Sequence, residues 1–133
     1  VTRKIGNEIE DTLNVILKNT RAETPRSDIR SPGYVHLKDA IGVKMARDRL
    51  SGRVGWSTKV IGKKLWRKAG WRARFFLFGT KGGVILSGRR KGARIPPQAG
   101  NDTLGRAIER NVERFFNRVK AASRQAFREG DLL

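Results

Sequence analysis

Apolar residues recur at helical spacing near both ends of the chain. Over residues 2–22 they lie three or four positions apart, with charged side chains between them: Ile5, Ile9, Leu13, Ile16 and Leu17. Over residues 101–128 the same period forms a longer stripe: Leu104, Ile108, Val112, Phe115, Phe116, Val119 and Phe127. Each pattern predicts an amphipathic helix. Asn101-Asp102 supplies an N-cap for the second helix.

Between these segments the period of the apolar residues changes to two. Apolar and other residues alternate over residues 41–45 and again over residues 53–58, with a turn between them, which predicts an antiparallel hairpin. A short helical turn is expected at residues 37–41. Residues 63–78 return to helical spacing and predict one continuous helix, which Gly79 is placed to end.

Regular periodicity is lost from about residue 80 to residue 100. This segment is rich in glycine and contains two prolines and the basic cluster Arg89-Arg90-Lys91. Long segments of this kind in compact domains are usually functional or disordered. We expect a flexible basic β-arm or loop that reaches a partner, with its hinge at three glycines: Gly79, Gly82 and Gly83.

The order of predicted elements favours a single α+β domain over residues 1–133. A chain of this length buries a modest core. A small antiparallel β-sheet would pack against the N-terminal helix and the long C-terminal helix. The extended basic arm would project from that domain.

Positive charge is concentrated in the middle of the chain. The protein has 30 Lys and Arg against 12 Asp and Glu, and residues 49–101 carry fourteen basic side chains and no acidic one. The flanking segments are close to balance, and on the C-terminal helix Glu109 and Glu113 are expected to pair with neighbouring arginines. Segregated positive charge predicts a surface turned toward a polyanion, most simply nucleic acid, or toward an acidic protein.

Aromatic residues are interleaved with this charge, above all in residues 71–78, WRARFFLF. Beside arginines, aromatic rings stack on nucleic-acid bases in some proteins. Spacings of one, three and four residues are more typical of packing in a core or at a subunit interface. We favour packing for six residues: Trp71, Phe75, Phe76, Phe78, Phe115 and Phe116.

Signals for catalysis are weak. The chain has no Cys and one His, His36, and its basic centre has no carboxylate, so neither a metal site nor a catalytic triad is expected. The stretch GTKGG at residues 79–83 lacks the spacing of a phosphate-binding loop. We therefore expect a protein that is not an enzyme and needs no cofactor. No run of 18 uncharged apolar residues occurs, so no membrane-spanning helix is expected.

The order of motifs resembles the neck or tail-completion family of long-tailed bacteriophages, proteins of the head–tail joining region. In that family an N-terminal helix leads to a P…G-x-L-x-x-S-I connection. A strand pair, a short helix reading roughly YAxxxEFGT, an arm ending in ARPFL and a long C-terminal helix follow. Here the loosely matching stretches are Pro25 and Gly33 with LKDAI (37–41), then WRARFFLFGT (71–80) and GARIPP (92–97).

Three positions depart from the family pattern. Trp71 replaces the usual Tyr, which an aromatic packing role tolerates. Leu77 replaces the usual Glu, so no role of that acid carries over to this chain. Ile95-Pro96-Pro97 replaces PFL, which removes the buried Phe anchor and requires the arm to dock differently.

The resemblance implies a virion protein without catalysis, assembled in the host cytoplasm into a closed and commonly six-fold ring. Such a ring joins the head connector to the tail tube, and DNA passes through its channel. The aromatic residues would then pack in the core or against the next subunit. Five basic residues would face the channel or an acidic neighbouring ring: Lys81, Arg89, Arg90, Lys91 and Arg94.

Two other functions remain open at this point. A tail-terminator ring, which caps the tail tube, has a similar size and layout. A free protein that binds nucleic acid without sequence preference is favoured by composition alone. An enzyme acting on nucleic acid would need carboxylates in a basic groove to hold metal, which the acid-free centre argues against.

Overall fold

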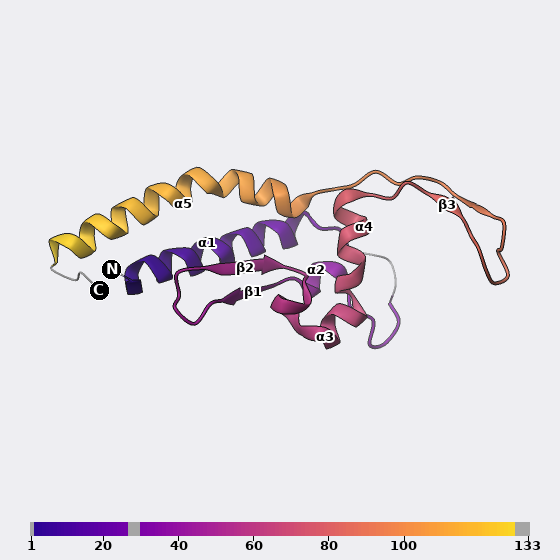
Figure 1. Cartoon of the computed structure of the whole chain (residues 1–133), viewed down its shortest axis with the longest axis horizontal. Helices are drawn as coiled ribbons and strands as arrows, with labels where there is room; N and C mark the ends of the chain where they lie inside the picture. Colours follow the sequence, from indigo (N-terminus) through magenta and orange to yellow (C-terminus); the bar gives the residue numbers. More distant parts are fainter. Residues whose placement is uncertain (1, 27–29, 130–133) are drawn as a thin grey trace.

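Two long helices lie side by side along the molecule and form its first layer (Figure 1). They are α1 (Thr2–Glu23) and α5 (Thr103–Arg128), with bounds close to those that the hydrophobic spacing predicts. The computed structural model describes residues 2–26 and 30–129. The fold is α+β as predicted, with small antiparallel sheets beside an N-terminal and a long C-terminal helix.

The face that α5 turns toward α1 is made of small and polar side chains rather than of its large apolar ones. Its buried residues are Thr103, Ala107, Asn111, Ala122 and Ala126. Short side chains let two helix backbones approach closely. Large members of the predicted apolar stripe therefore lie on the flank of α5 and are exposed: Ile108, Val112, Phe116 and Phe127. The period of the stripe is confirmed, but its burial in the single chain is incomplete, since Leu104, Phe115 and Val119 are only partly buried.

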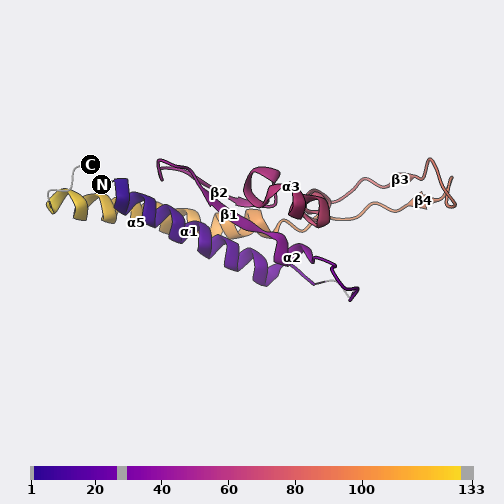
Figure 2. The same cartoon turned by 90° about the horizontal axis from the view of Figure 1, so that it is seen from below.

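A two-stranded hairpin packs against α1 and forms the second layer (Figure 2). The strands β1 (Gly42–Met45) and β2 (Gly52–Gly55) pair antiparallel, with Val43 opposite Val54, as the two-residue period predicts. A Cβ at Gly52 would lie 2.4 Å from Leu13 Cδ1 of α1, so a larger residue there would displace the Leu13 side chain. The absence of a side chain at Gly52 thus lets β2 lie close to α1.

The hydrophobic core lies where the hairpin meets the segment that follows it. Its buried members come from α2 (Leu37–Ala40) and the residue after it, from the end of the hairpin, and from a later short helix and the residue before that helix's first turn: Ala40, Ile41, Trp56, Ala69, Ala73 and Leu77. Trp56 is the largest of them, and its indole Nε1 donates a hydrogen bond of 2.8 Å to the carbonyl of Leu37. This bond satisfies the polar atom of a buried ring.

The prediction of one continuous helix over residues 63–78 is wrong. The chain instead forms α3 (Thr58–Lys68), a 3-10 turn (Gly70–Arg72) and α4 (Ala73–Phe78). The break falls at Ala69, whose φ of −146° is not helical. At Gly70 a Cβ would lie 2.8 Å from the carbonyl oxygen of Trp56, so the chain bends around the core tryptophan where glycine permits it. Gly79 ends α4 as predicted, with a φ of 77°.

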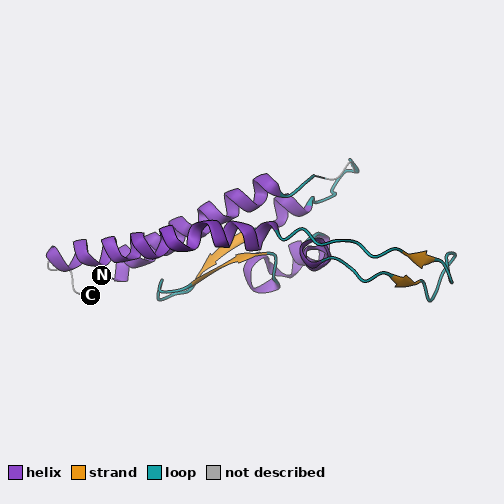
Figure 3. Cartoon of the chain, turned by 90° about the horizontal axis from the view of Figure 1, so that it is seen from above, coloured by secondary structure: helices purple, strands orange, loops and turns teal. Residues whose placement is uncertain are grey.

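The segment after α4 is a β-hairpin that projects beyond the helices (Figures 1 and 3). Its strands are β3 (Gly83–Val84) and β4 (Arg94–Ile95), which pair antiparallel, and a bridge between Thr80 and Gln98 joins the two legs nearer the base. We call residues 80–98 the arm. Of the two alternatives, a loop or a β-arm, the structure has the β-arm.

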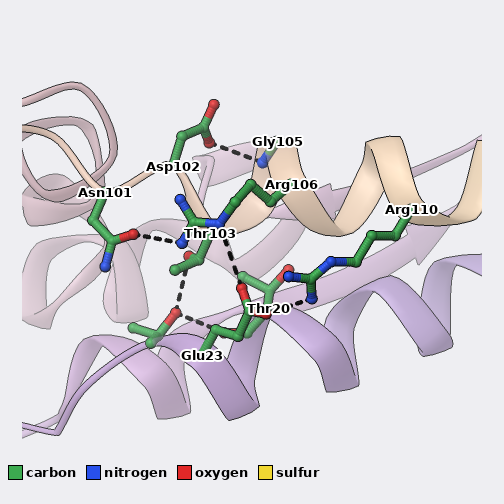
Figure 4. A network of polar contacts seen from close by, with 9 residues as sticks. Thr20, Glu23, Asn101, Asp102, Thr103, Gly105, Arg106 and Arg110 are labelled. Carbon is green, nitrogen blue, oxygen red and sulfur yellow. Dashed lines mark hydrogen bonds and ion pairs between the residues drawn. The ribbon is translucent and has the colours of Figure 1, made fainter.

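Threonine hydroxyl groups join α1 to α5 where the two helices meet near the base of the arm (Figure 4). The side chain of Thr24 donates to the carbonyl of Thr20 over 2.7 Å, and its oxygen lies 3.1 Å from the hydroxyl of Thr103. Asp102 caps α5, since its Oδ1 accepts the backbone N–H of Gly105 over 2.8 Å. The predicted N-cap is therefore confirmed.

Glu23 lies beside this junction and faces two arginines of α5. It accepts a hydrogen bond from Arg110, and Arg106 Nε lies 3.7 Å from its other carboxylate oxygen. The hydrogen bond from Arg110 is the largest cause that lowers the pKa of Glu23 below its ordinary value, with the charges of both arginines adding to it. The carboxylate thus stays ionised to lower pH in the folded protein.

Replacing the core tryptophan tests the position of the core. Trp56→Ala is expected to lower the free energy of unfolding by about 3–5 kcal/mol, as other buried aromatic truncations do, because Trp56 is 4% exposed. Phe78→Ala is the matched control, since Phe78 is 70% exposed and surface changes usually stay within about 0.5 kcal/mol. Urea denaturation of both variants measures the difference. Equal losses would place the core elsewhere.

The lowered pKa of Glu23 makes part of the stability depend on pH. A depressed carboxyl pKa stabilises the fold above the unfolded-state value, about 4.3 for glutamate, and that contribution is lost as the pH falls through the folded value. We expect Glu23→Gln to be less stable than the parent at neutral pH, with the gap closing below the ordinary glutamate pKa. Urea denaturation across the acid range measures it. If the difference in stability between Glu23→Gln and the parent did not change with pH, the lowered pKa assigned to Glu23 would be contradicted.

Candidate interaction surfaces

Ion pairs between α1 and α5 neutralise most of the acidic side chains of α1. Arg106 and Arg110 contact Glu23, and the Nε of Arg118 lies 2.7 Å from a carboxylate oxygen of Glu8. The two nearly balanced flanks of the sequence therefore lie against each other. The predicted pairs of Glu109 and Glu113 with neighbouring arginines are wrong, because within the described residues neither carboxylate makes an ion pair.

In the basic centre of the sequence, two cations have partners among the described residues. Arg49 pairs with Glu10 over 2.6 Å, and Arg72 lies over the Tyr34 ring and donates to the carbonyl of Val35. The other twelve basic side chains of residues 49–101 are exposed and make no ion pair with a described carboxylate. They come from β2, α3, α4 and the arm, so the unpaired charge gathers toward the end of the molecule from which the arm projects (Figure 1).

All five basic residues predicted to face a partner lie exposed on the arm. Lys81 is near its base, Arg94 is in β4, and three consecutive residues form the tip: Arg89, Arg90 and Lys91. Within the arm no acidic residue screens them. Like charges on a narrow hairpin repel one another, a cost that an anionic partner removes. Whether that partner is DNA or an acidic protein stays a prediction.

Among the six aromatic residues predicted to pack, the structure separates core positions from surface ones. Phe76 is partly buried against the core cluster, and Phe115 is partly buried beside Phe116, with 5.6 Å between the ring centroids. The prediction of packing in the core is wrong for four of them, because their side chains are exposed: Trp71, Phe75, Phe78 and Phe116. Trp71 and Phe75 contact each other edge to face, with 6.3 Å between their ring centroids, whereas Phe116 belongs to the long helix α5. For these four, packing against another subunit stays a prediction.

Two of the three predicted hinge glycines lie where the legs of the arm approach each other. A Cβ on Gly79 would lie 2.3 Å from the carbonyl oxygen of Gln98, and one on Gly82 would lie 2.4 Å from that of Ile95. Gly83 has no atom so close. The first two glycines therefore hold the base of the arm narrow, and hinge motion stays a prediction.

Sequence reasoning missed an apolar groove along the molecule. Two cavities, of about 670 and 310 Å³, lie between β2 and α5 and share four lining residues: Leu13, Ile16, Gly52 and Ile108. Trp66 and Phe78 line the larger cavity, and Val112 and Phe115 line the smaller one. Together they make one groove with α1 as its floor. The signal in the sequence is that α5 carries more large apolar residues than its contact with α1 covers.

The described residues offer no arrangement for metal chemistry. No group of three or more His, Asp or Glu side chains among them could hold a metal ion. No helix in residues 2–26 or 30–129 is long and apolar enough to cross a membrane. The features available for function are therefore the arm, its cations, the exposed aromatics and the groove.

Comparison with known proteins does not extend this list. No family model, curated protein or solved structure matches the chain significantly.

Proposed function

We propose that the protein is a ring-forming structural subunit at the head–tail interface of a long-tailed bacteriophage, joining the head connector to the tail tube and lining the DNA channel. The motif order supports this proposal, because helix, strand pair, short helix, arm and long helix follow one another as the resemblance implies. The single observation that carries it is the combination of an uncovered apolar surface with a projecting, unpaired cationic arm on one small chain.

The uncovered apolar surface favours self-association. Large apolar residues exposed in the single chain include Trp66, Phe78, Ile108, Val112 and Phe116, several of which line the groove. Monomeric soluble proteins seldom leave contiguous apolar patches of this kind open to water, and such patches mark interaction sites. A ring covers them by repeating one heterologous contact until it closes.

The cationic arm favours a polyanionic neighbour. The basic centre has twelve unpaired exposed Lys and Arg side chains, five of them on the arm, and such groups bind phosphates without reading sequence, as a channel through which any DNA passes requires. In a ring the arms would repeat around the axis, either toward the channel or toward an acidic face of the adjoining ring. The same features fit a tail-terminator ring, which differs in its position on the tail and not in its chemistry.

A free nucleic-acid-binding protein is the second candidate, favoured by the same unpaired cations. It predicts strong binding of the isolated chain to DNA. A protein with six to ten phosphate contacts loses about 10³–10⁵ in affinity between 50 and 200 mM salt. Fluorescence anisotropy with random-sequence duplex DNA over that range distinguishes the two candidates. Feeble binding by the isolated chain favours the assembly protein.

Two measurements test the proposal: the mass of the protein's assemblies in solution and the position of the protein in the phage particle. Analytical ultracentrifugation should show closed oligomers, or a monomer that forms rings only when the adjoining connector is present. Cryo-electron microscopy of the particles should place the protein at the neck. A stable monomer that is absent from purified particles would overturn the proposal.

Neutralising the tip of the arm separates assembly from folding. The triple variant Arg89→Ala, Arg90→Ala, Lys91→Ala should change the free energy of unfolding by no more than about 0.5 kcal/mol, because exposed loop substitutions have small effects. It should reduce the joining of heads to tails, or DNA retention, in a complementation assay. Arg114→Ala, Lys120→Ala, Arg124→Ala is the matched control, since it removes the same charge from exposed residues of α5. Equal activity of both triples would exclude a role of the tip.

A further inference from the structure

The apolar groove is bordered by the edge of a β-strand. All four residues of β2, Gly52 to Gly55, line the larger cavity. Successive residues of a strand point to opposite faces of the sheet, so a cavity that contacts all four lies along the side of the strand. In the described part of the chain β2 pairs with β1 alone, and its other edge is therefore open to the groove.

An open strand edge over an apolar floor has the two features that an incoming strand uses. Unpaired backbone groups of the edge provide hydrogen bonds, and alternate apolar side chains of the added strand fill the floor. The floor here includes Leu13 and Ile16 of α1, and its far wall includes Ile108 and Val112 of α5. The occupant that fits is thus a short strand with apolar residues two positions apart.

The arm contains such a strand. Val84 and Leu86 lie two positions apart and are 52% and 83% exposed. The leg that contains β3 has no proline, whereas β4 is followed by Pro96-Pro97, which lacks N–H donors for a ladder. A hairpin whose strands are two residues long is at best marginally stable by itself in water. The arm therefore gains stability from a sheet to which it is added.

In the described chain the arm lies away from its own groove. It projects beyond α4 (Figures 1 and 3). The residues that line the groove belong instead to α1, β2, α5 and the helices between β2 and the arm. The two legs approach each other closely at Gly79 and Gly82, so the arm leaves the body as a narrow hairpin. A second copy of the chain is thus the source of an arm that can enter the groove while its own arm keeps this geometry.

We propose that the arm of one copy docks in the groove of the next, with the outer edge of β3 pairing to the free edge of β2. The β1–β2 hairpin and the docked hairpin then form one four-stranded sheet shared by two chains. Val84 and Leu86 cover Leu13, Ile16 and Ile108. This inference rests on the self-association in the proposed function and names the contact that produces it.

Disulfide trapping tests the contact directly, because the chain has no cysteine. Arg53→Cys and Ile85→Cys place one thiol each on β2 and beside β3, on the faces directed away from the floor. The two single variants are mixed and oxidised. The expected product is a covalent heterodimer with the 53–85 link, identified by mass spectrometry of peptides. Lys120→Cys replaces Arg53→Cys as the control, since Lys120 is exposed on α5 and does not line the groove, and it should give no such product.

A chain carrying both cysteines resolves where the arm comes from. Mixed with an excess of cysteine-free chain, the double variant should lose most of its 53–85 link, because its neighbours then have no thiol. An undiminished link within one chain would show that each arm folds back into its own groove and would overturn the proposal.

Charged substitutions provide the second measurement. Val84→Asp and Val112→Asp are both at exposed positions, so circular dichroism should show each variant folded. Each should raise the dissociation constant of self-association about a hundredfold or more, because it buries an unpaired charge in the contact. Phe127→Asp is the control outside the groove and should leave the constant unchanged.

The outcomes separate this inference from the proposed function. Rings that form without the 53–85 link and are insensitive to Val84→Asp would overturn arm docking and leave the proposed function standing. If the 53–85 link forms but purified phage particles do not contain the protein, arm docking is confirmed and the proposed phage function is overturned.

Discussion

The close packing of α5 on α1 through a row of short side chains determines most of what the rest of the molecule presents. Ala107, Ala122 and Ala126 allow the two backbones to approach, and Thr103 adds a hydroxyl contact to Thr24. This contact fixes the rotation of α5 about its own axis. Its arginines are thereby turned toward the acids of α1, and its large apolar residues toward β2 and solvent.

The same contact explains why the net charge of +18 is unevenly distributed over the surface of the molecule. Arg106, Arg110 and Arg118 of α5 pair with Glu23, Glu8 and Asp11 of α1, and Glu10 pairs with Arg49. No carboxylate of α1 is left for α3 or the arm, whose cations remain unpaired within the described residues. Ion pairs on the surface add little stability each. Their larger effect here is to leave the cations of the arm without an acidic partner among the described residues.

Spacing in the sequence was sufficient to predict the helices, the hairpin and the projecting arm, because each depends on local period and on glycine placement. It was not sufficient for the break at Ala69 and Gly70, since the apolar spacing there is still helical and only contact with Trp56 requires the bend. The buried face of α5 was missed for a related reason. Size alone ranks Phe116 above Ala122 as a core residue, but the distance between two helices decides which one fits.

The uneven distribution of charge also gives the molecule an electrostatic field that differs between its two ends. The helices α1 and α5 carry carboxylates together with cations, whereas the arm carries cations and no carboxylate (Figure 1). The field of a polyanion exerts a torque on such a body and turns it arm-first before any contact is made. Orientation is thus achieved during diffusion, over distances comparable with the Debye length, about 10 Å at 0.1 M salt.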